Sequence, residues 1–209
     1  RSVGSHSINH LGGYTRTESE LDFAGVVKQT KVYHKRLSTD TEKVLTQNFE
    51  YDSQNRLKKQ THQVDSGATE ILAENTYNEL SQLSQKKVGN GLQTIDYGYD
   101  IRGVITKIND PANLGNKLFG YEVKYQNPEY ANVAPGKSNG NISEVDWKVS
   151  SDGILKRYSY VYDPLNRLKD AIYSEPGTTV PYNNKYNEHV TYDLNGNIKT
   201  LKRNGFAIF

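Results

Sequence analysis

The residue pair best suited to metal chemistry is His6 and His10, which stand four positions apart. On a helix this spacing would place two imidazoles on one face, where both could bind one metal ion. No Glu lies between the two histidines, no third ligand is nearby, and Gly12 and Gly13 oppose a helix. We therefore expect a solvated loop or a connecting strand at these histidines, and no metal site.

A second candidate is the segment from Asp193 to Asn204, which begins like a calcium-binding loop because oxygen-bearing side chains recur at alternate positions. The likeness ends at the sixth position, where Ile198 replaces the required Gly, and at the twelfth, where Asn204 replaces the required Glu. A hairpin turn accounts for the same residues. We therefore expect neither a bound metal nor any other cofactor.

Catalytic motifs are missing from the sequence, which has no nucleophile elbow, phosphate-binding loop, dinucleotide-binding glycine pattern or His-Glu-x-x-His. His34, His62 and His189 stand in strand-like contexts, at spacings that do not join them. The absence of Cys removes thiol chemistry and disulfides. We predict a chain that is not an enzyme and has no catalytic residues. A Ser-His-Asp group assembled from distant segments stays open at this point.

The single Trp, Trp147, lies in the alternating stretch from Ser143 to Val149, which predicts a strand. We expect Trp147 to pack against neighbouring tyrosines. An exposed Trp beside a polar loop would instead stack on a sugar. Trp147 is therefore the candidate ligand-binding residue for an alternative function, that of a glycan-binding or adhesive surface array.

The strands that carry these residues are best defined in the stretch that begins at Tyr158. Tyr158, Tyr160 and Tyr162 alternate with other residues, so all three rings project from one face of an extended strand. Residues 163–166 read Asp-Pro-Leu-Asn and predict a type I turn, with Asn166 left-handed at a bulge. The stretch therefore predicts a complete β-hairpin.

The same pattern recurs along the chain as an anchor residue, then Asp or Asn, a Gly, Asn or Ser four residues after the anchor, and an aliphatic residue six after it. Six copies are anchored at Leu21, Tyr51, Tyr77, Tyr99, Tyr162 and Tyr192. We interpret the five tyrosines as structural repeat anchors. The turn positions expected at positive φ are Gly25, Asn55, Gly103, Asn166 and Gly196. Repeats of this period predict an array of hairpins.

One degenerate copy is expected between Tyr99 and Tyr162, because this gap of 63 residues is about two units wide. Tyr125 begins the degenerate copy and residues 140–142, Gly-Asn-Ile, end it, with Asn127 to Asn139 inserted in place of the short turn. Insertions of this length are uncommon in compact arrays and often carry function. A tolerated surface insertion is the plainer interpretation.

Composition limits what such an array can be. Leu, Ile, Val and Phe make up only 47 of 209 residues, which is too few for a thick two-layer core, while 16 tyrosines favour sheets. In each return strand the aliphatic residue is followed two positions later by a polar one. We therefore expect burial to concentrate beside the turns and to fade along the strands, leaving a thin sheet that is wet on both faces.

The mixed charges and the residues at the start of the chain limit the partners that we expect. The 26 basic and 24 acidic residues are mixed along the chain, which argues against a nucleic-acid partner, although Lys59, Lys86 and Lys87 stand among tyrosines. No apolar run is long enough to span a membrane. The chain has no Met and opens on Arg1, so we expect it to be a piece of a longer protein.

Residues 162–168, Tyr-Asp-Pro-Leu-Asn-Arg-Leu, resemble the YD-repeat, or Rhs, family, whose signature is Tyr-Asp, two variable residues, Gly, Arg and Leu. The stretch departs from the signature only by Asn in place of Gly. The resemblance covers the chain from about Leu21 to Lys202. The segments 10–13 and 140–143, placed ahead of their repeats, look like variants found in large Bacteroidota Rhs proteins.

The resemblance implies an all-β fold in which tandem antiparallel hairpins form a curved sheet, the wall of a hollow Rhs-type shell. Residues 1–209 would be one fragment of this array, without a separate toxin domain. The implied function is a non-catalytic structural segment that encloses or carries a toxin or effector domain, or that forms a large secreted or cell-surface body. The implied partners are the rest of the parent protein and its enclosed carboxy-terminal domain, with export machinery or surface glycans.

Overall fold

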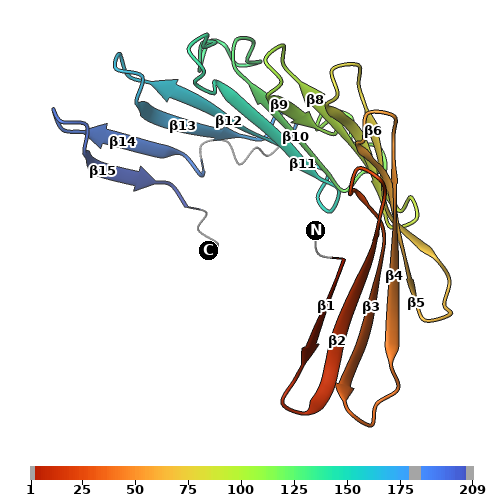
Figure 1. Ribbon diagram of the computed structural model, residues 1–209. Helices are drawn as coiled ribbons and strands as arrows, with labels where there is room; N and C mark the ends of the chain where they lie inside the picture. Colours follow the sequence, from red (N-terminus) through yellow and green to blue (C-terminus); the bar gives the residue numbers. More distant parts are fainter. Residues whose placement is uncertain (1–2, 179–184, 206–209) are drawn as a thin grey trace. The chain divides into compact units, whose positions relative to one another are not determined.

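The computed structural model describes residues 3–178 and 185–205, and the regular structure in this part of the chain is entirely β (Figure 1). Within these residues no helix is long and apolar enough to cross a membrane. The strands are β1 (Gly4–Ile8), β2 (Gly12–Leu21), β3 (Val27–Leu37), β4 (Lys43–Tyr51), β5 (Leu57–Val64), β6 (Glu70–Tyr77), β7 (Leu83–Val88), β8 (Gln93–Tyr99), β9 (Ile105–Ile108), β10 (Phe119–Lys124), β11 (Glu144–Val149), β12 (Leu155–Tyr162), β13 (Leu168–Ser174), β14 (Glu188–Tyr192) and β15 (Ile198–Arg203).

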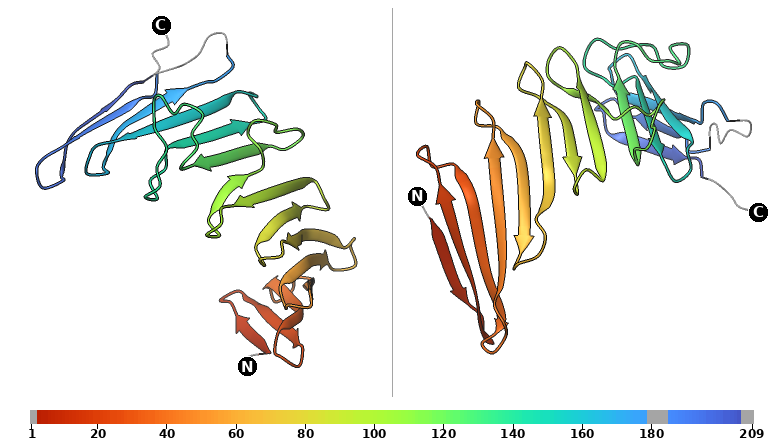
Figure 2. Two further views of the ribbon diagram at one scale, coloured as in Figure 1. Left: turned by 90° about the horizontal axis from the view of Figure 1, so that it is seen from above. Right: turned by 90° about the vertical axis from the view of Figure 1, so that its right-hand side faces the viewer.

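The strands form an antiparallel meander in which sheet order follows chain order from β1 to β15. The chain divides into two compact units, residues 1–95 and 96–209, which we describe separately. In the first unit β1 to β7 pair in succession. β8 crosses the boundary between the units, and from it the succession continues through β15 in the second unit. Figure 2 shows the hairpins following one another along each unit. The prediction of an all-β fold of tandem antiparallel hairpins is confirmed.

Each of the six repeat copies forms a hairpin that closes between its anchor and its aliphatic residue, as Tyr51 does with Leu57. The register shifts by one residue immediately before every anchor, which marks a β-bulge. The five predicted turn positions have φ between 61° and 88°, and Ser81 takes the same place in the sixth copy at 65°. The turn conformation predicted from the sequence is therefore present in all six copies.

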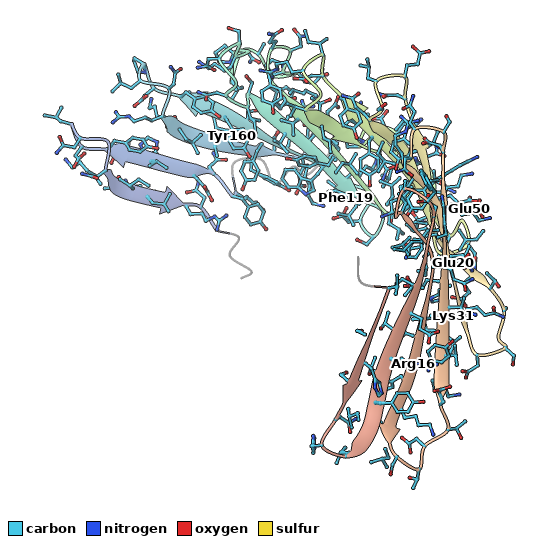
Figure 3. All side chains as sticks on the ribbon, in the orientation of Figure 1. Arg16, Glu20, Lys31, Glu50, Phe119 and Tyr160 are labelled. Atoms are coloured by element: carbon cyan, nitrogen blue, oxygen red, sulfur yellow. The ribbon has the colours of Figure 1, made fainter. Side chains whose placement is uncertain are left out.

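The first unit is a single layer of sheet. Strands contact only their sequence neighbours, and among its described residues only Gly13 and Ala73 are buried. Charged side chains line one face because alternate strand residues share a side. Figure 3 shows four of them, Arg16, Glu20, Lys31 and Glu50. The first unit is therefore a sheet with solvent on both faces, as the composition predicts.

The second unit has a small core. Val123, Val145, Ala171, Tyr173 and Val190 are buried. The strand register places all five on one face, because cross-strand partners in a sheet point to the same side. Burial here depends on chain segments that lie over the sheet, which distinguishes this unit from the first.

The prediction that burial concentrates beside the turns is wrong for the second unit. Ile105 and Ile198 lie beside two turns and are 46% and 63% exposed, whereas Tyr173, near the far end of β13, is 3% exposed. Ile105 is exposed because the pairing of β9 with β10 ends at Lys107. Ile198 is exposed because, among the described strands, β15 pairs only with β14. Tyr173 is covered because the ring of Tyr186, from the connection to β14, packs on it with centroids 5.0 Å apart.

Candidate functional site

The residue after each anchor organises its turn, as Asp52 illustrates. Its Oδ1 accepts the backbone N–H groups of Gln54 and Arg56 at 2.9 and 3.0 Å, and its Oδ2 accepts Arg56 Nε at 2.7 Å. The Asp52 carbonyl accepts the N–H of Asn55, and the Asp52 N–H donates to the Arg56 carbonyl. One carboxylate therefore satisfies the turn's backbone donors and positions a cation at the same time.

The same contact recurs in every copy. The side-chain oxygen of the residue after the anchor accepts the N–H of the residue five after the anchor at 2.8–3.0 Å, for Asp22, Asp52, Asn78, Asp100, Asp163 and Asp193. In the turns of Asp52, Asp100 and Asp163, that backbone N–H is the main cause that holds the carboxyl pKa below its usual value. These carboxylates are therefore charged, and they stabilise the turn through hydrogen bonds.

Consecutive hairpins are joined by the anchor hydroxyl. At four anchors the hydroxyl donates a hydrogen bond to the carbonyl of the aliphatic residue in the preceding hairpin. The bonds are Tyr51 to Val27 at 3.1 Å, Tyr77 to Leu57 at 2.9 Å, Tyr162 to Ile142 at 2.8 Å and Tyr192 to Leu168 at 2.7 Å. A bond between hairpins that recurs at the repeat period explains why the anchor is Tyr rather than Phe.

A cation from the preceding copy lies over each of these anchor rings. The distances from cation to ring centroid are 4.7 Å for Lys28 and Tyr51, 4.4 Å for Arg56 and Tyr77, 5.9 Å for Arg102 and Tyr125, 5.7 Å for Lys137 and Tyr162, and 4.5 Å for Arg167 and Tyr192. These separations are within the range of cation–π attraction. Apart from Lys137 of the insertion, each of these cations also pairs with the Asp of its own turn and so links that turn to the next repeat. We call the hydroxyl bond plus the cation–ring contact the joint.

The predicted anchors take different parts in the joints. Tyr51, Tyr77, Tyr162 and Tyr192 each make both contacts, and Tyr99 occupies the equivalent bulge position opposite Ile105. Leu21 holds the anchor place of the first copy without a hydroxyl. In the degenerate copy Tyr125 is the anchor and Ile142 supplies the acceptor carbonyl. The second role of the cation could have been suspected from its recurrence in the repeat, but which ring it covers depends on the pairing of strands.

A buried ion cluster, formed by Lys124, Glu144, Asp146 and Arg157, lies on the face of the second unit opposite the apolar core. Arg157 donates to both carboxylate oxygens of Asp146 at 2.6 and 2.7 Å, and Lys124 Nζ lies 2.9 Å from Glu144 and 2.8 Å from Asp146. The Glu144 side chain is fully buried and that of Asp146 is 4% exposed. Two cations balance two carboxylates, so the cluster is neutral as a whole.

The insertion between β10 and β11 covers this ion cluster. The Glu144 carboxylate accepts the backbone N–H groups of Glu129 and Tyr130 at 3.1 and 3.0 Å. Arg157 lies over the Tyr130 ring at 4.6 Å, and Ala134 is fully buried. The segment Asn127 to Asn139 is therefore fixed on the sheet by a carboxylate of β11, and it differs from a free surface loop.

The electrostatics of the ion cluster argue against acid–base work. Burial alone would raise the pKa of Asp146, yet the hydrogen bonds from Arg157 and Lys124 hold it below its usual value. Burial alone would lower the pKa values of Lys124 and Arg157, yet the two carboxylates raise both. All these shifts favour the charged forms at neutral pH, which suits a structural cluster better than a proton donor.

Trp147 takes part in an aromatic cluster on the apolar face. Its ring stacks on Tyr158 with centroids 5.7 Å apart and lies 6.0 Å from Tyr173. Tyr158 in turn stacks on Tyr160 at 6.0 Å, and burial raises the pKa of Tyr160 to about 12. Trp147 is half-buried. The expected packing of Trp147 against tyrosines is confirmed.

The histidines singled out in the sequence lie in different strands and do not come together. His6 lies in β1 with its ring edge on Tyr14, and His34, His62 and His189 hydrogen-bond to Thr15, Glu70 and Asp170 respectively. No three of His, Cys, Asp and Glu gather as metal ligands within residues 3–178 and 185–205. Asp193 to Asn197 form the hairpin turn described above, with Asn197 Nδ2 donating to Asp193 Oδ2 at 2.8 Å.

A groove of about 950 Å³ lies in the second unit between the turn after Tyr99 and the insertion. Its charged lining residues are Arg102, Lys107, Lys124, Lys137, Asp100, Asp110, Glu122 and Glu129. Several of these pair with one another, such as Lys107 with Glu122 at 3.1 Å. Charges of both signs are therefore already compensated inside the groove, and none points to a particular ligand.

Neither a known protein-family model nor a curated protein matches the chain. Among solved structures it is similar to the Tc holotoxin pore of Photorhabdus luminescens, at 15% identity and a TM-score of 0.45, over 86% of this chain and 10% of that one. It is also similar to a complex of TcdB2, TccC3 and Cdc42, at 14% identity and a TM-score of 0.39, over 87% and 10%. The chain spans about a tenth of the length of these chains. Likeness at this level assigns neither a family nor an activity.

Proposed function

We propose that the chain is a non-catalytic structural segment of a YD-repeat wall of the Rhs type, in which hairpins in series form a curved sheet around an enclosed space. The observation that carries the proposal is the joint, which recurs from hairpin to hairpin with one hydroxyl bond and one cation over a ring. The residues that define the repeat are therefore engaged in holding the array together.

The single-layer architecture supports the same role. The first unit has almost no buried residue among those described, so its stability must come from strand pairing and from the joints. A sheet of this kind tolerates water on both sides, as a wall between two aqueous spaces requires. The charged groups of the second unit are compensated in pairs, as expected of a structural part.

The wider role follows from the sequence resemblance. In a parent protein of the Rhs kind, such as the large Bacteroidota examples, residues 1–209 would be one fragment of the array. The wall would enclose or carry a toxin or effector domain, or it would form a large secreted or cell-surface body. Its partners would then be the rest of the parent protein and the enclosed carboxy-terminal domain, with export machinery acting on the whole. Trp147, half-buried against Tyr158, gives no specific support for glycan binding.

The proposal is tested by removing one joint hydroxyl, with Tyr77→Phe. The expected loss is about 0.5–1.5 kcal/mol in the free energy of unfolding, because the Leu57 carbonyl loses the Tyr77 hydroxyl and keeps only the Asn75 side-chain amide as a side-chain donor. Amide hydrogen exchange should accelerate in both β5 and β6, since the bond joins two hairpins. Tyr33→Phe is the matched control, because Tyr33 lies on the opposite face with Arg16 over its ring at 4.2 Å.

Two results would contradict the proposed function. One is equal exchange in the Tyr77→Phe and Tyr33→Phe chains, which would mean that the hydroxyl bond joins nothing. The other is an enzymatic activity of the purified chain that disappears when a single polar cluster is mutated.

A further inference from the structure

In the second unit, β9 and β10 are paired over part of their length only (Figure 1). Ile108 pairs with Tyr121 and Lys107 with Glu122, and no further pair of these two strands follows among the described residues. The turn half of β9, which begins at Ile105, is therefore not paired with β10. We call the boundary between these two strands the seam.

The joint at the seam is incomplete. Arg102 lies over the Tyr125 ring at 5.9 Å, the longest of the five cation–ring distances. The Tyr125 hydroxyl makes no hydrogen bond within residues 3–178 and 185–205, whereas four other anchor hydroxyls bond to the preceding hairpin. The cation–ring contact is therefore the only part of the joint that is present at the seam.

The boundary between β13 and β14 shows that short pairing does not by itself prevent a complete joint. Only two positions of β13 pair with β14, at Asp170 and Ala171. The joint is nevertheless complete, because the Tyr192 hydroxyl donates to the Leu168 carbonyl at 2.7 Å and Arg167 lies over the Tyr192 ring at 4.5 Å. Among these two boundaries, the missing hydroxyl bond is therefore particular to the seam.

The groove of about 950 Å³ lies at the unpaired half of the seam. Ile101 and Arg102 line one side of the groove, and Tyr125, Glu129 and Ser138 line the other. Within the part of the chain that the structure describes, no hydrogen bond or ion pair joins residues 100–106 to residues 125–140. The specific contact across this part of the groove is that of Arg102 with Tyr125.

Each side of the groove is well ordered internally. On one side, the Asp100 carboxylate closes the turn by accepting the N–H groups of Arg102 and Val104, both at 2.9 Å. On the other side, the Glu144 carboxylate of β11 holds the insertion through two backbone N–H groups. Each side can therefore move as one body.

The link end of the seam is held at Asn109, which directly follows β9. Its N–H and Oδ1 bond to the backbone of Asp96 at 2.8 and 2.9 Å, and its Nδ2 donates to the Phe119 carbonyl at 2.7 Å. Asn109 is buried, and Lys107 pairs with Glu122 at 3.1 Å beside it. The two hairpins are therefore joined firmly at one end of the seam and loosely at the other.

We propose that the seam is a gate, in which the turn half opens and closes while the link end at Asn109 is the pivot. Opening breaks the contact between Arg102 and Tyr125 and widens the groove, and it unfolds neither hairpin. Hinge motion of this kind needs only a few residues at the ends of elements to absorb the change in the backbone. In the proposed wall, the open gate would be a gap between two hairpins of one unit.

The gate goes beyond the proposed wall function and is tested separately from it. Unchanged exchange in the Tyr77→Phe chain would contradict the wall, because it concerns a complete joint in the first unit. The gate concerns a distance within the second unit, so either proposal can fail while the other holds.

The test measures distances between two spin labels by double electron–electron resonance in the whole chain, which has no native Cys. The gate pair is Ile101→Cys with Ser138→Cys, two exposed positions on opposite sides of the groove. The control pair is Ser138→Cys with the exposed Leu165→Cys, which spans the complete joint of Tyr162. Both pairs share the label at Ser138, so motion of the insertion itself broadens both distance distributions.

The gate pair should give a distance distribution roughly twice as wide as that of the control pair, because open and closed positions are both populated. Arg102→Gln should widen the distribution of the gate pair further, since it removes the contact that closes the gate. Arg167→Gln removes an Arg from an anchor ring at a complete joint, so it is the matched control and should leave the gate pair unchanged.

Far-UV circular dichroism checks that each variant keeps its sheet. Tyr125→Leu, which removes the ring instead of the cation, replaces an Arg102 variant that loses the sheet. Two results would overturn the gate. One is an equal width of the gate pair and the control pair without further substitution. The other is a gate pair that is no wider in the Arg102→Gln chain than in the Arg167→Gln chain.

Discussion

Asp52 and its equivalents show how much structure one side chain can determine. Its carboxylate accepts two backbone N–H groups and one guanidinium N–H, and that guanidinium then covers the ring of Tyr77. A neutral Asn performs the backbone part at Asn78, where its own amide donates to Gln82 Oε1 at 2.8 Å. The requirement at this position is therefore an oxygen acceptor, and the charge adds the cation.

The left-handed turn position should tolerate only residues suited to positive φ. Gly103, at φ 82°, has no Cβ to strain, so Gly103→Val is expected to cost about 1–2 kcal/mol of unfolding free energy in urea titrations. Asn166→Gly, at φ 61°, is the matched change in the opposite direction and should be nearly neutral. Equal stabilities of the two variants would contradict the strain argument.

Acid should open the Asp turns before the Asn turn. Hydrogen bonds led by the Arg56 N–H hold the pKa of Asp52 below the ordinary value of 3.8. A carboxyl with a lowered folded pKa stabilises the fold above its unfolded pKa, and this contribution is lost as the pH falls through the folded value. Below pH 3.8, protection of the Arg56 N–H against exchange should therefore fall, while the Gln82 N–H bonded to Asn78 keeps its protection.

This acid prediction is measured by NMR hydrogen exchange, with each rate corrected for the intrinsic pH dependence of exchange. The internal control is the Asn78 turn, which has the same backbone geometry without a titrating group. Parallel loss of protection at Arg56 and Gln82 would show that the turn carboxylate is not the group responsible.

At the scale of elements, the buried ion cluster explains how a long insertion is held on a thin sheet. The Glu144 carboxylate accepts two backbone N–H groups of the insertion. It is held in turn by Lys124 Nζ of β10 and by Arg157 Nε of β12, which lies 3.3 Å from Glu144 Oε1. Glu144→Gln removes one charge from a neutral, buried set and should cost roughly 3–5 kcal/mol. Limited proteolysis should then cleave the insertion between residues 127 and 139 faster than in the wild-type chain.

Glu129→Gln is the control for the ion cluster. Glu129 is 64% exposed and lies 3.5 Å from Lys124, so its loss should cost at most about 1 kcal/mol and leave cleavage of the insertion unchanged. Similar effects of the two substitutions would mean that the buried Glu144 stabilises the fold no more than the exposed Glu129 does. The insertion would then be held by other contacts.

The hairpins could be predicted because each one is specified by residues that lie close together in the sequence. The alternation of Tyr158, Tyr160 and Tyr162, together with Asn166 at the end of the turn, specifies strand, reversal and bulge within one short stretch. The joints could not be predicted in detail, since the bond from Tyr77 to Leu57 depends on which strands pair and in which register.

The ion cluster could not be predicted either, because its burial depends on tertiary structure. Glu144 and Asp146 alternate with Val145 and Trp147, a pattern that ordinarily indicates a solvent face for the acidic residues. They are buried because the insertion that directly precedes β11 folds back over that face. The alternation of residues along the strand does not indicate the path of this insertion. Ile198 shows the opposite error, an apolar repeat residue that is exposed, because β15 pairs only with β14 among the described strands.

Taken as a whole, the chain is a series of hairpins that we expect to be interchangeable. Among the described strands, contacts run only between consecutive ones, so each repeat should be removable if its neighbours keep the right direction. Deleting residues 52–77 removes two strands and one turn, and it joins the end of β4 directly to the turn that begins at Asn78. Deleting residues 52–64 removes one strand and reverses every strand that follows.

The measurement is amide hydrogen exchange of the two deletion chains beside the wild type. The 52–77 deletion should keep the protection of β2, β3 and β7, because a complete repeat has been taken out in phase. The 52–64 deletion should lose protection on both sides of the cut, because it leaves the Tyr77 hydroxyl without the Leu57 carbonyl. Equal protection in the two deletion chains, or loss in the in-phase deletion alone, would contradict the view of this protein as a wall of repeats.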